Sequence, residues 1–158
     1  MRVGLGYDIH PFAGGRALVL GGVALDGPGL AGHSDADVIA HAVADALLGP
    51  VGLPDLGSLF PESDERFEGA ASIELLHEVA RRVADAGWRV ENIDVVVAAD
   101  RPALASHLTK MCANVSDALR PAGEVHVSIT PKHAEGLDAV GRAEGIAAWA
   151  VALLDRVA

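Results

Sequence analysis

Cysteine, aromatic residues and basic residues are all scarce in this chain of 158 residues. Its single cysteine, Cys112, cannot form a disulfide within the chain, which is typical of a reducing compartment. Aromatic residues make up 4% of the sequence, too few for platforms that stack nucleic-acid bases. Lysine and arginine number 12 against 22 acidic residues, so the net charge of −10 repels phosphate backbones and argues against nucleic-acid binding.

Long apolar segments are also missing. The longest, Ile146–Leu154, has nine residues, whereas a membrane-spanning helix needs about 20. The first ten residues contain one basic residue and reach Asp8 before any long apolar run, so we expect no signal peptide. With 51% apolar residues, the chain can still fill a core. We therefore expect one cytoplasmic domain over residues 1–158, with no membrane partner.

Apolar periodicity predicts an α/β or α+β sandwich in which helices cover a sheet. The tail, residues 145–157, is ambiguous, because its alanines favour a helix whereas its alternating large residues favour a strand. Residues 50–71 are rich in proline, glycine and acidic residues and predict a long loop. The remaining predicted elements are a strand at 1–9, a hairpin at 17–25, helices at 34–48, 72–86 and 103–120, and strands at 93–98 and 125–129.

Turn-forming and capping residues set the expected ends of the helices. Ser34 and Ser72 are expected N-caps, and Asp37 occupies a position like that of a capping box. The pair Gly49-Pro50 is expected to end the first helix. The free N–H groups at the start of that helix, Ser34 to Asp37, favour an anion such as a phosphate.

Two segments carry candidate metal ligands. Asp8 and His10 lie two residues apart on a predicted strand and therefore point to one face. His41 lies on a predicted helix face between Asp37 and Asp45, so that either carboxylate could orient its ring. Two histidines and one aspartate would leave a fourth position open, as in catalytic zinc sites. A polar strand end and a solvated helix face are the alternatives, and these segments alone leave the choice open.

Two further segments carry polar residues in turn-rich surroundings. Asp55 followed by Gly57 can hold a pair of sugar hydroxyls, although aspartate and glycine are also common in ordinary turns. Lys132, His133 and Arg142 can supply positive charge, and Glu135 is a suitable ligand for magnesium. The alternative for this second segment is a charged surface loop.

Four segments together carry a resemblance that covers essentially the whole chain: RVGLGYDIHPF, AGHSDADVIAHAVADALLG, DLGSLFPESD and GRAEGIA. They closely resemble the 2-C-methyl-D-erythritol 2,4-cyclodiphosphate synthases, the cyclases of the non-mevalonate isoprenoid pathway. The resemblance implies a ferredoxin-like sandwich with a four-stranded mixed sheet backed by helices. It also implies a homotrimer around a central apolar channel, active sites shared between subunits, and a strand for the final segment.

The resemblance also assigns roles to individual residues. Asp8, His10 and His41 look like zinc ligands that face the substrate, and Glu135 looks like the ligand of a second metal, magnesium or manganese. The other implied contacts are His33 and Ser34 for the methylerythritol phosphate, Asp55 and Gly57 for hydroxyls, Phe60 and Asp64 in a loop over the substrate, Asp100, Pro102 and Ala105 around cytosine, and Arg142 at the trimer axis, where relatives hold an anion or a prenyl diphosphate.

The implied enzyme is a divalent-metal-dependent phosphorus-oxygen lyase. It would convert 4-diphosphocytidyl-2-C-methyl-D-erythritol 2-phosphate to 2-C-methyl-D-erythritol 2,4-cyclodiphosphate and release CMP. His33 would be catalytic, through stabilisation of developing charge. The sequence departs from the family where Pro131-Lys132-His133-Ala134 replaces consecutive threonines, and we expect Lys132 or His133 to act in their place. It also has Ala103 in place of a lysine, and Asp138-Ala139 in place of a glycine and an aromatic residue.

Three alternatives to the cyclase remain open on the sequence. The first is a phosphohydrolase that uses the same metal and lets water attack. The second is a trimer that holds a prenyl diphosphate in its channel without catalysis. The third is a domain that the metal merely stabilises.

Overall fold

The computed structural model describes residues 1–157. Its strands are β1 (Arg2–Ala13), β2 (Leu18–Leu20), β3 (Val23–Leu25), β4 (Gly29–Leu30), β5 (Trp88–Ala98), β6 (His126–Lys132) and β7 (Gly145–Arg156). Its helices are α1 (Val38–Val51), α2 (Leu56–Leu59), α3 (Ser72–Asp85), α4 (Leu108–Leu119) and α5 (Asp138–Gly141), with 3-10 helices η1 (Glu65–Phe67) and η2 (Arg120–Ala122).

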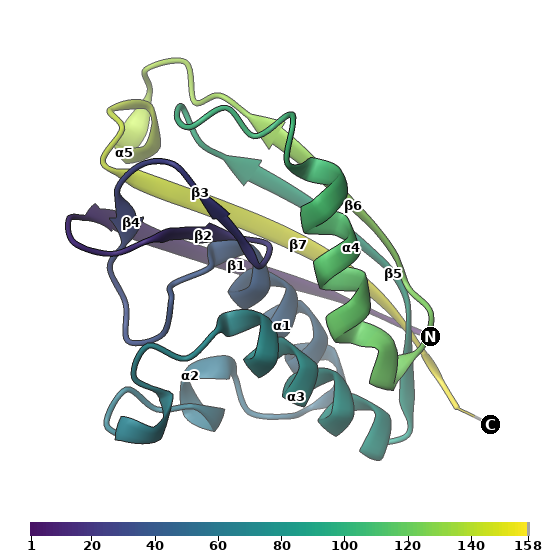
Figure 1. Cartoon of the computed structure of the whole chain (residues 1–158). Coiled ribbons are helices and arrows are strands. Elements are labelled where there is room, and N and C mark those ends of the chain that lie inside the picture. The colour runs from purple at the N-terminus through teal and green to yellow at the C-terminus, as the bar shows by residue number, and fades with distance from the viewer. Residues whose placement is uncertain (158) are drawn as a thin grey trace.

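One mixed sheet forms the larger layer of the molecule. Its strand order is β4-β1-β7-β5-β6, and every neighbouring pair is antiparallel except β5 and β6. The helices α1, α3 and α4 lie together on one face of this sheet (Figure 1). The predicted α+β sandwich with a mixed sheet is confirmed. The predicted count of four strands is wrong by one, because the two-residue strand β4 adds to the edge beside Phe12 and Ala13.

Helix α1 packs unusually close to strand β1. A Cβ atom on Gly4 would lie 1.9 Å from the carbonyl oxygen of Ala46, and one on Gly6 would lie 1.9 Å from that of Ala42. Both glycines face the helix, and side chains there would push the two backbones apart. This close approach positions the first turn of α1 beside the end of β1.

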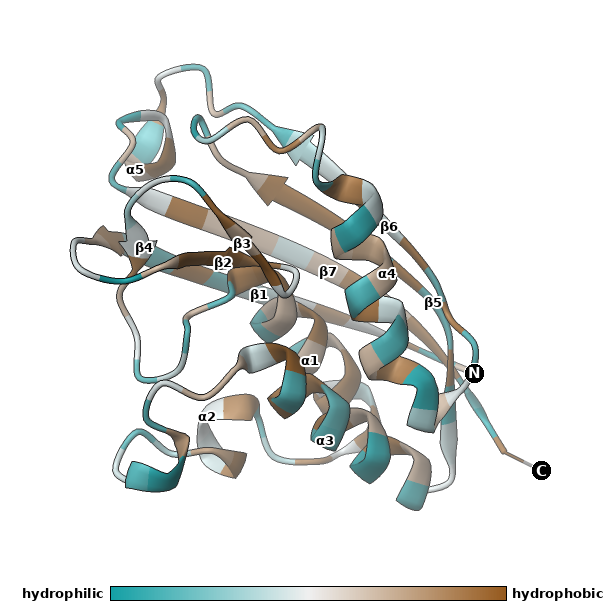
Figure 2. Cartoon of the chain, viewed as in Figure 1, coloured by the Kyte–Doolittle hydropathy of each residue, from teal (hydrophilic) through white to brown (hydrophobic). Residues whose placement is uncertain are grey.

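Apolar residues fill the space between the helices and the sheet. Brown, apolar positions dominate the strands and the inner parts of α1, whereas the outward turns of α3 and α4 are teal (Figure 2). The opposite face of the sheet also carries large apolar side chains, and these are exposed: Val3, Leu5, Tyr7, Ile9, Trp149 and Val151. Among residues 1–157, no helix combines the length and apolar character needed to span a bilayer.

The predicted ends of the first helix are wrong. The N-cap is Asp37, whose carboxylate accepts hydrogen bonds from the N–H groups of Ile39 and Ala40, so the helix begins at Val38 and not at Ser34. Pro50 lies inside the last turn, and the helix ends at Val51. Because Gly49 has no Cβ, the usual clash between a proline and the preceding helical residue is relieved, and the helix continues.

The other predicted elements exist with shifted ends. The tail is the long strand β7, which settles that ambiguity, and β1 continues through Pro11 to Ala13. The expected loop 50–71 contains α2 and η1. The third predicted helix begins five residues later, at Leu108, because residues 103–107 form a turn anchored by the buried side chain of Leu104.

The second predicted helix has the expected extent but a different cap. Its N-cap is Ala71, which makes no side-chain capping bond. Ser72 is therefore not the cap that the sequence suggested. It is the first residue of α3, and only 1% of it is exposed. Its hydroxyl is directed into the centre described next.

Candidate metal centre and substrate pocket

Asp8 and His10 extend from the same face of β1, the face that the two glycines turn toward α1. Oδ2 of Asp8 lies 3.1 Å from Nε2 of His10. The other ring nitrogen of His10, Nδ1, lies 2.5 Å from the carbonyl oxygen of Ala31, to which it donates a hydrogen bond. That bond turns Nε2 toward Asp8, so that Nε2 is the ring nitrogen that would bind a metal once its proton is released.

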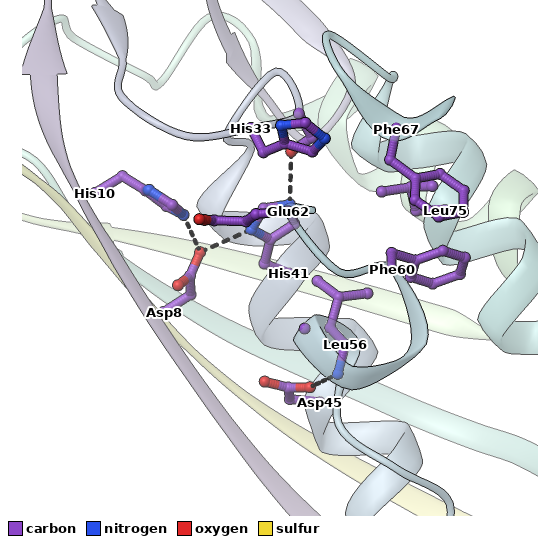
Figure 3. A pocket seen from close by; sticks show the side chains of 12 residues that line it. Asp8, His10, His33, His41, Asp45, Leu56, Phe60, Glu62, Phe67 and Leu75 are labelled. Carbon is purple, nitrogen blue, oxygen red and sulfur yellow. Dashed lines mark hydrogen bonds and ion pairs between the residues drawn. The ribbon is translucent and has the colours of Figure 1, made fainter. Parts of the chain in front are cut away.

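His41 approaches the same carboxylate from the first turns of α1. Its Nδ1 lies 3.0 Å from Oδ2 of Asp8. Its Nε2 lies 2.8 Å from Oγ of Ser72 and 3.2 Å from Oγ of Ser34. One ligand atom from each of Asp8, His10 and His41 lies within 4.8 Å of the other two. Figure 3 shows the two rings converging on Asp8 from different elements.

The electrostatics of this group suit a cation. Burial by itself raises the pKa of Asp8, but hydrogen bonds from His10 and His41 outweigh it and hold the pKa at about 2. The same hydrogen bond with Asp8 raises the pKa of His10. A charged carboxylate and two imidazole nitrogens form the donor set that zinc prefers. The residues present therefore fit the predicted metal, with both histidines held by further hydrogen bonds.

The three residues open onto a cavity of about 200 Å³. Four other residues that the sequence nominated line it, and these are His33, Ser34, Gly57 and Phe60. His33 is tied to the loop over the cavity, because its Nε2 lies 3.1 Å from the carbonyl oxygen of Asp64. The rings of Phe60 and Phe67 pack edge to face, with centroids 5.1 Å apart (Figure 3).

Two acidic residues nominated from the loop are engaged with their own neighbours. Asp55 is the N-cap of α2 and accepts a hydrogen bond from the hydroxyl of Ser58. The carboxylate of Asp64 forms an ion pair with Arg66 at 2.5 Å. Both therefore shape the loop, and neither lines the cavity.

The residues nominated for the nucleotide lie around a second cavity of about 130 Å³. Pro102, Ala105, Lys132 and His133 line it, at the adjacent carboxyl ends of the parallel strands β5 and β6. The carboxylate of Asp100 joins the two loops, since it accepts a hydrogen bond of 2.8 Å from the N–H of Ala134 and lies 3.7 Å from Nδ1 of His133. The side chains of this group and of the metal centre line separate cavities within the chain.

Glu135 and Arg142 are both exposed, and neither lines the metal cavity. Glu135 directly follows Ala134 and has a positive backbone φ of 55°. Arg142 donates a hydrogen bond of 2.7 Å to Glu144.

Two expectations about the helix that carries His41 are wrong. Neither flanking carboxylate orients its ring, because Asp37 caps the helix and Asp45 accepts a hydrogen bond from the N–H of Leu56. The ring instead reaches across to β1 and α3. The start of this helix is also no open anion site, since the buried carboxylate of Asp37 occupies it and accepts further hydrogen bonds from Gly21 and Gly22.

Several lining residues were missed by sequence reasoning. The sequence pattern around Ser72 indicates only a helix cap, and nothing in it indicates a contact with a histidine 31 positions earlier. Four residues from the loop and from α3 were not nominated, and a loop rich in acids and aromatics close to the DLGSLFP motif is the one signal that points to them: Leu56, Glu62, Phe67 and Leu75.

Comparison with known proteins gives consistent results. The profile of the YgbB family matches residues 1–155. The 2-C-methyl-D-erythritol 2,4-cyclodiphosphate synthase of Rubrobacter xylanophilus is 54% identical, over 98% of this chain and 95% of its own length. The bifunctional enzyme IspD/IspF of Anaeromyxobacter sp. (strain Fw109-5) is 55% identical over 99% of this chain, which spans 40% of that longer protein.

Solved structures match with the same coverage. The structure of a 2C-methyl-D-erythritol-2,4-cyclodiphosphate synthase in its CDP-bound form superimposes with a TM-score of 0.86 and 37% identity, over 98% of this chain and 100% of the other. The IspF of Plasmodium falciparum in complex with CDP gives a TM-score of 0.84 and 29% identity, over 99% of this chain and 97% of the other.

Proposed function

The chain belongs to the YgbB family, that of the 2-C-methyl-D-erythritol 2,4-cyclodiphosphate synthases, and from this premise we propose that it is such a lyase working in the cytoplasm. The substrate is 4-diphosphocytidyl-2-C-methyl-D-erythritol 2-phosphate. Its 2-phosphate oxygen attacks the β-phosphorus, the bond from that phosphorus to the oxygen bridging it to the α-phosphate breaks, and CMP leaves. The convergence of Asp8, His10 and His41 on one point beside a cavity carries this proposal.

The metal centre is assigned to residues that already fit a cation. Asp8, His10 and His41 hold zinc, and the exposed Glu135 holds magnesium or manganese. Divalent cations at these positions supply the positive charge that lets two phosphate groups approach each other. An acidic chain needs this charge, because its surface offers few basic residues.

The protein side chains bind and orient the substrate; no protein nucleophile is needed, because the attacking oxygen belongs to the substrate. His33 and Ser34 contact the 2-phosphate end, and Asp55 and Gly57 contact hydroxyls. Phe60 and the loop through Asp64 cover the cavity and exclude water, which would otherwise compete as nucleophile. The imidazole of His33 is held toward this loop by the carbonyl of Asp64, so loop closure and phosphate contact are linked.

The cytidine end is assigned to the second cavity. Backbone groups of residues 100–105 cradle the base, and Lys132 and His133 face the diphosphate in place of the threonines usual in the family. Because the two cavities are lined by separate residues of the chain, one substrate that needs both fits an active site built from two subunits. The CDP-bound relatives support a cytidine nucleotide as ligand.

A homotrimer would bring the two cavities together. The exposed apolar face of β1 and β7 supports this assembly, because Leu5 is 69% exposed and pairs in the sheet with Val151, and Tyr7 pairs with Trp149. Single chains seldom leave such a patch uncovered. The three sheets would surround an apolar channel, with Arg142 at its axis facing an anion or a prenyl diphosphate.

Phosphorus NMR of the zinc-loaded protein with substrate and magnesium tests the function. We expect the resonance of CMP together with the paired resonances of a cyclic diphosphate. Inorganic phosphate or an open-chain product would indicate a phosphohydrolase. Bound zinc and an intact trimer without CMP release would indicate a binding protein, and loss of thermal stability as the sole effect of chelation would indicate a metal-stabilised domain.

A further inference from the structure

A partly buried chain of hydrogen bonds lies behind the candidate metal centre. It runs from Asp35 through the hydroxyl of Ser72 to Nε2 of His41. The Ser72 residue is 1% exposed and comes from α3, whereas the other two precede or belong to α1. None of the roles proposed for substrate or metal contact uses Ser72 or Asp35.

The direction of this chain follows from counting protons. The carboxylate of Asp35 has no proton to give, so the hydroxyl of Ser72 donates its single proton to it. The oxygen of Ser72 can then only accept from His41, at 2.8 Å. Nε2 of His41 therefore carries a proton, and Nδ1 is the ring nitrogen that faces Asp8 and would bind a metal once its own proton is released.

Ser34 takes part without changing this direction. Its Oγ lies 3.1 Å from Oγ of Ser72 and accepts a hydrogen bond from the N–H of Ala36. Because the proton of Ser72 is already used, the hydroxyl of Ser34 donates to Ser72. Little water reaches the two serines, since Ser34 is 8% and Ser72 1% exposed, and hydrogen bonds in such surroundings are strengthened by the low dielectric.

We propose that Ser72, backed by Asp35, is a positioning residue that fixes the tautomer and orientation of His41 and thereby sets the affinity of the centre for zinc. Outer partners of metal-binding histidines contribute about 10–100-fold to metal affinity in general. The inference rests on the metal centre of the proposed function, but it does not depend on the reaction. It assigns a carboxylate–serine–histidine relay where a carboxylate usually contacts the histidine directly.

The test compares the zinc affinity of full-length variants by competition with a chelator. We expect Ser72→Ala to weaken zinc binding by about 10–100-fold. Asp35→Asn should weaken zinc binding less, because the amide oxygen of asparagine can still accept the proton of Ser72. Some weakening is expected, because the amide NH2 group can donate to Ser72 and the direction of the relay is then no longer fixed. Ser116→Ala is the matched control. The hydroxyl of Ser116 likewise donates one hydrogen bond, to the carbonyl of Val125, but Ser116 lies on α4 and does not line the metal cavity. Thermal unfolding of each variant checks that it folds.

A second readout separates orientation from general weakening. In the zinc-loaded protein labelled with ¹⁵N-histidine, the proton on Nε2 of His41 should be visible by NMR and slow to exchange. Ser72→Ala should make its exchange fast, and Ser72→Thr, which keeps the hydroxyl, should restore both this signal and most of the affinity. Should Ser72→Ala not fold, Asp35→Asn and Ser72→Thr supply the comparison.

The outcomes are distinct. Zinc affinity of Ser72→Ala within twofold of the Ser116→Ala control, or a lone pair on Nε2 in the wild-type protein, overturns the relay. A protein that binds zinc but does not cyclise the substrate contradicts the proposed function, and the affinities then still decide on the relay. Wild-type protein that binds no zinc overturns both.

Discussion

Oδ2 of Asp8 lies 3.0 Å from Nδ1 of His41, although 33 positions separate the two residues in the chain. The contact exists because β1 and α1 pack against each other through glycine. It joins the two sequence motifs that carry the candidate ligands, and it gives the first prediction.

His41→Ala should remove most of the bound zinc and most of the turnover. Two ligands remain in that variant, and two donors hold zinc far less tightly than three. Metal analysis of the purified protein and the rate of CMP release measure the two effects. His77→Ala, on the outer side of α3, is the control and should keep both. If His41→Ala retains its zinc and its rate, the ligand assignment is wrong.

His133→Ala should slow turnover by roughly 100-fold while the zinc content stays unchanged. The imidazole lines the second cavity, where it replaces a threonine expected to act on the transition state, and it does not line the metal cavity. The measurement is kcat and KM beside metal analysis. His126→Ala, at the opposite end of β6, is the matched control. An unchanged rate in His133→Ala would remove this residue from the mechanism.

The sequence allowed the metal centre to be predicted because its ligands lie at readable spacings. Alternation on a strand places Asp8 and His10 on one face, and the family motifs supplied His41. The wrong expectations concern interactions between elements. Asp37 and Asp45 lie at helical spacing from His41, yet the ring turns away from its own helix toward β1 and α3.

The relay shows the limit of local patterns more clearly. A serine before an amphipathic helix is typical of an N-cap, and Ser72 fits that pattern. What decides its role is the packing of α3 against α1, which places its hydroxyl beside His41. Only tertiary contacts carry that information. The end of α1 differs from the prediction for a local reason, since Gly49 permits a helical Pro50.

Leu5→Glu should convert a trimer to monomers. The side chain is 69% exposed on the apolar face of β1, and a carboxylate buried there in an interface has no partner. Sedimentation velocity measures the assembly state. Ala113→Glu is the control, because Ala113 is exposed on α4, which covers the other face of the sheet. A wild-type monomer, or a trimer that tolerates Leu5→Glu, contradicts the proposed assembly.

Glu78 should contribute stability that depends on pH. Hydrogen bonds from Arg81 and Arg82 lower the pKa of Glu78 from 4.5 to about 2. The unfolded chain therefore binds more protons between these values, so the contribution is complete above about pH 4.5 and is lost as the pH falls toward 2. Solvent screens this surface group, which limits its contribution to about 0.5–1 kcal/mol.

Urea unfolding of wild type and Glu78→Gln at several pH values measures this contribution. The difference in unfolding free energy should shrink between pH 4.5 and the acid limit of folding. Glu74→Gln is the control. The residues three and four positions after Glu74 are His77 and Glu78, whereas those after Glu78 are two arginines. A difference that stays constant with pH would show that the ion pairs do not stabilise the fold.

Gly6→Ala should damage both the fold and the metal centre. The new Cβ would lie 1.9 Å from the carbonyl oxygen of Ala42, so β1 and α1 must separate, at a cost of about 3 kcal/mol or more. Gly6 lies two residues before Asp8 on the same face, and Ala42 directly follows His41. The separation therefore moves the two ligands apart.

Urea unfolding and zinc competition on the same samples test this link between packing and the centre. Gly14→Ala is the matched control, because nothing lies within 4 Å of the added Cβ, and its stability should change by less than about 0.5 kcal/mol. Solution conditions that stabilise the fold of Gly6→Ala should not restore its zinc affinity, since the ligand spacing is altered in the folded protein itself. If folded Gly6→Ala binds zinc as tightly as Gly14→Ala, the close approach of β1 and α1 serves stability alone.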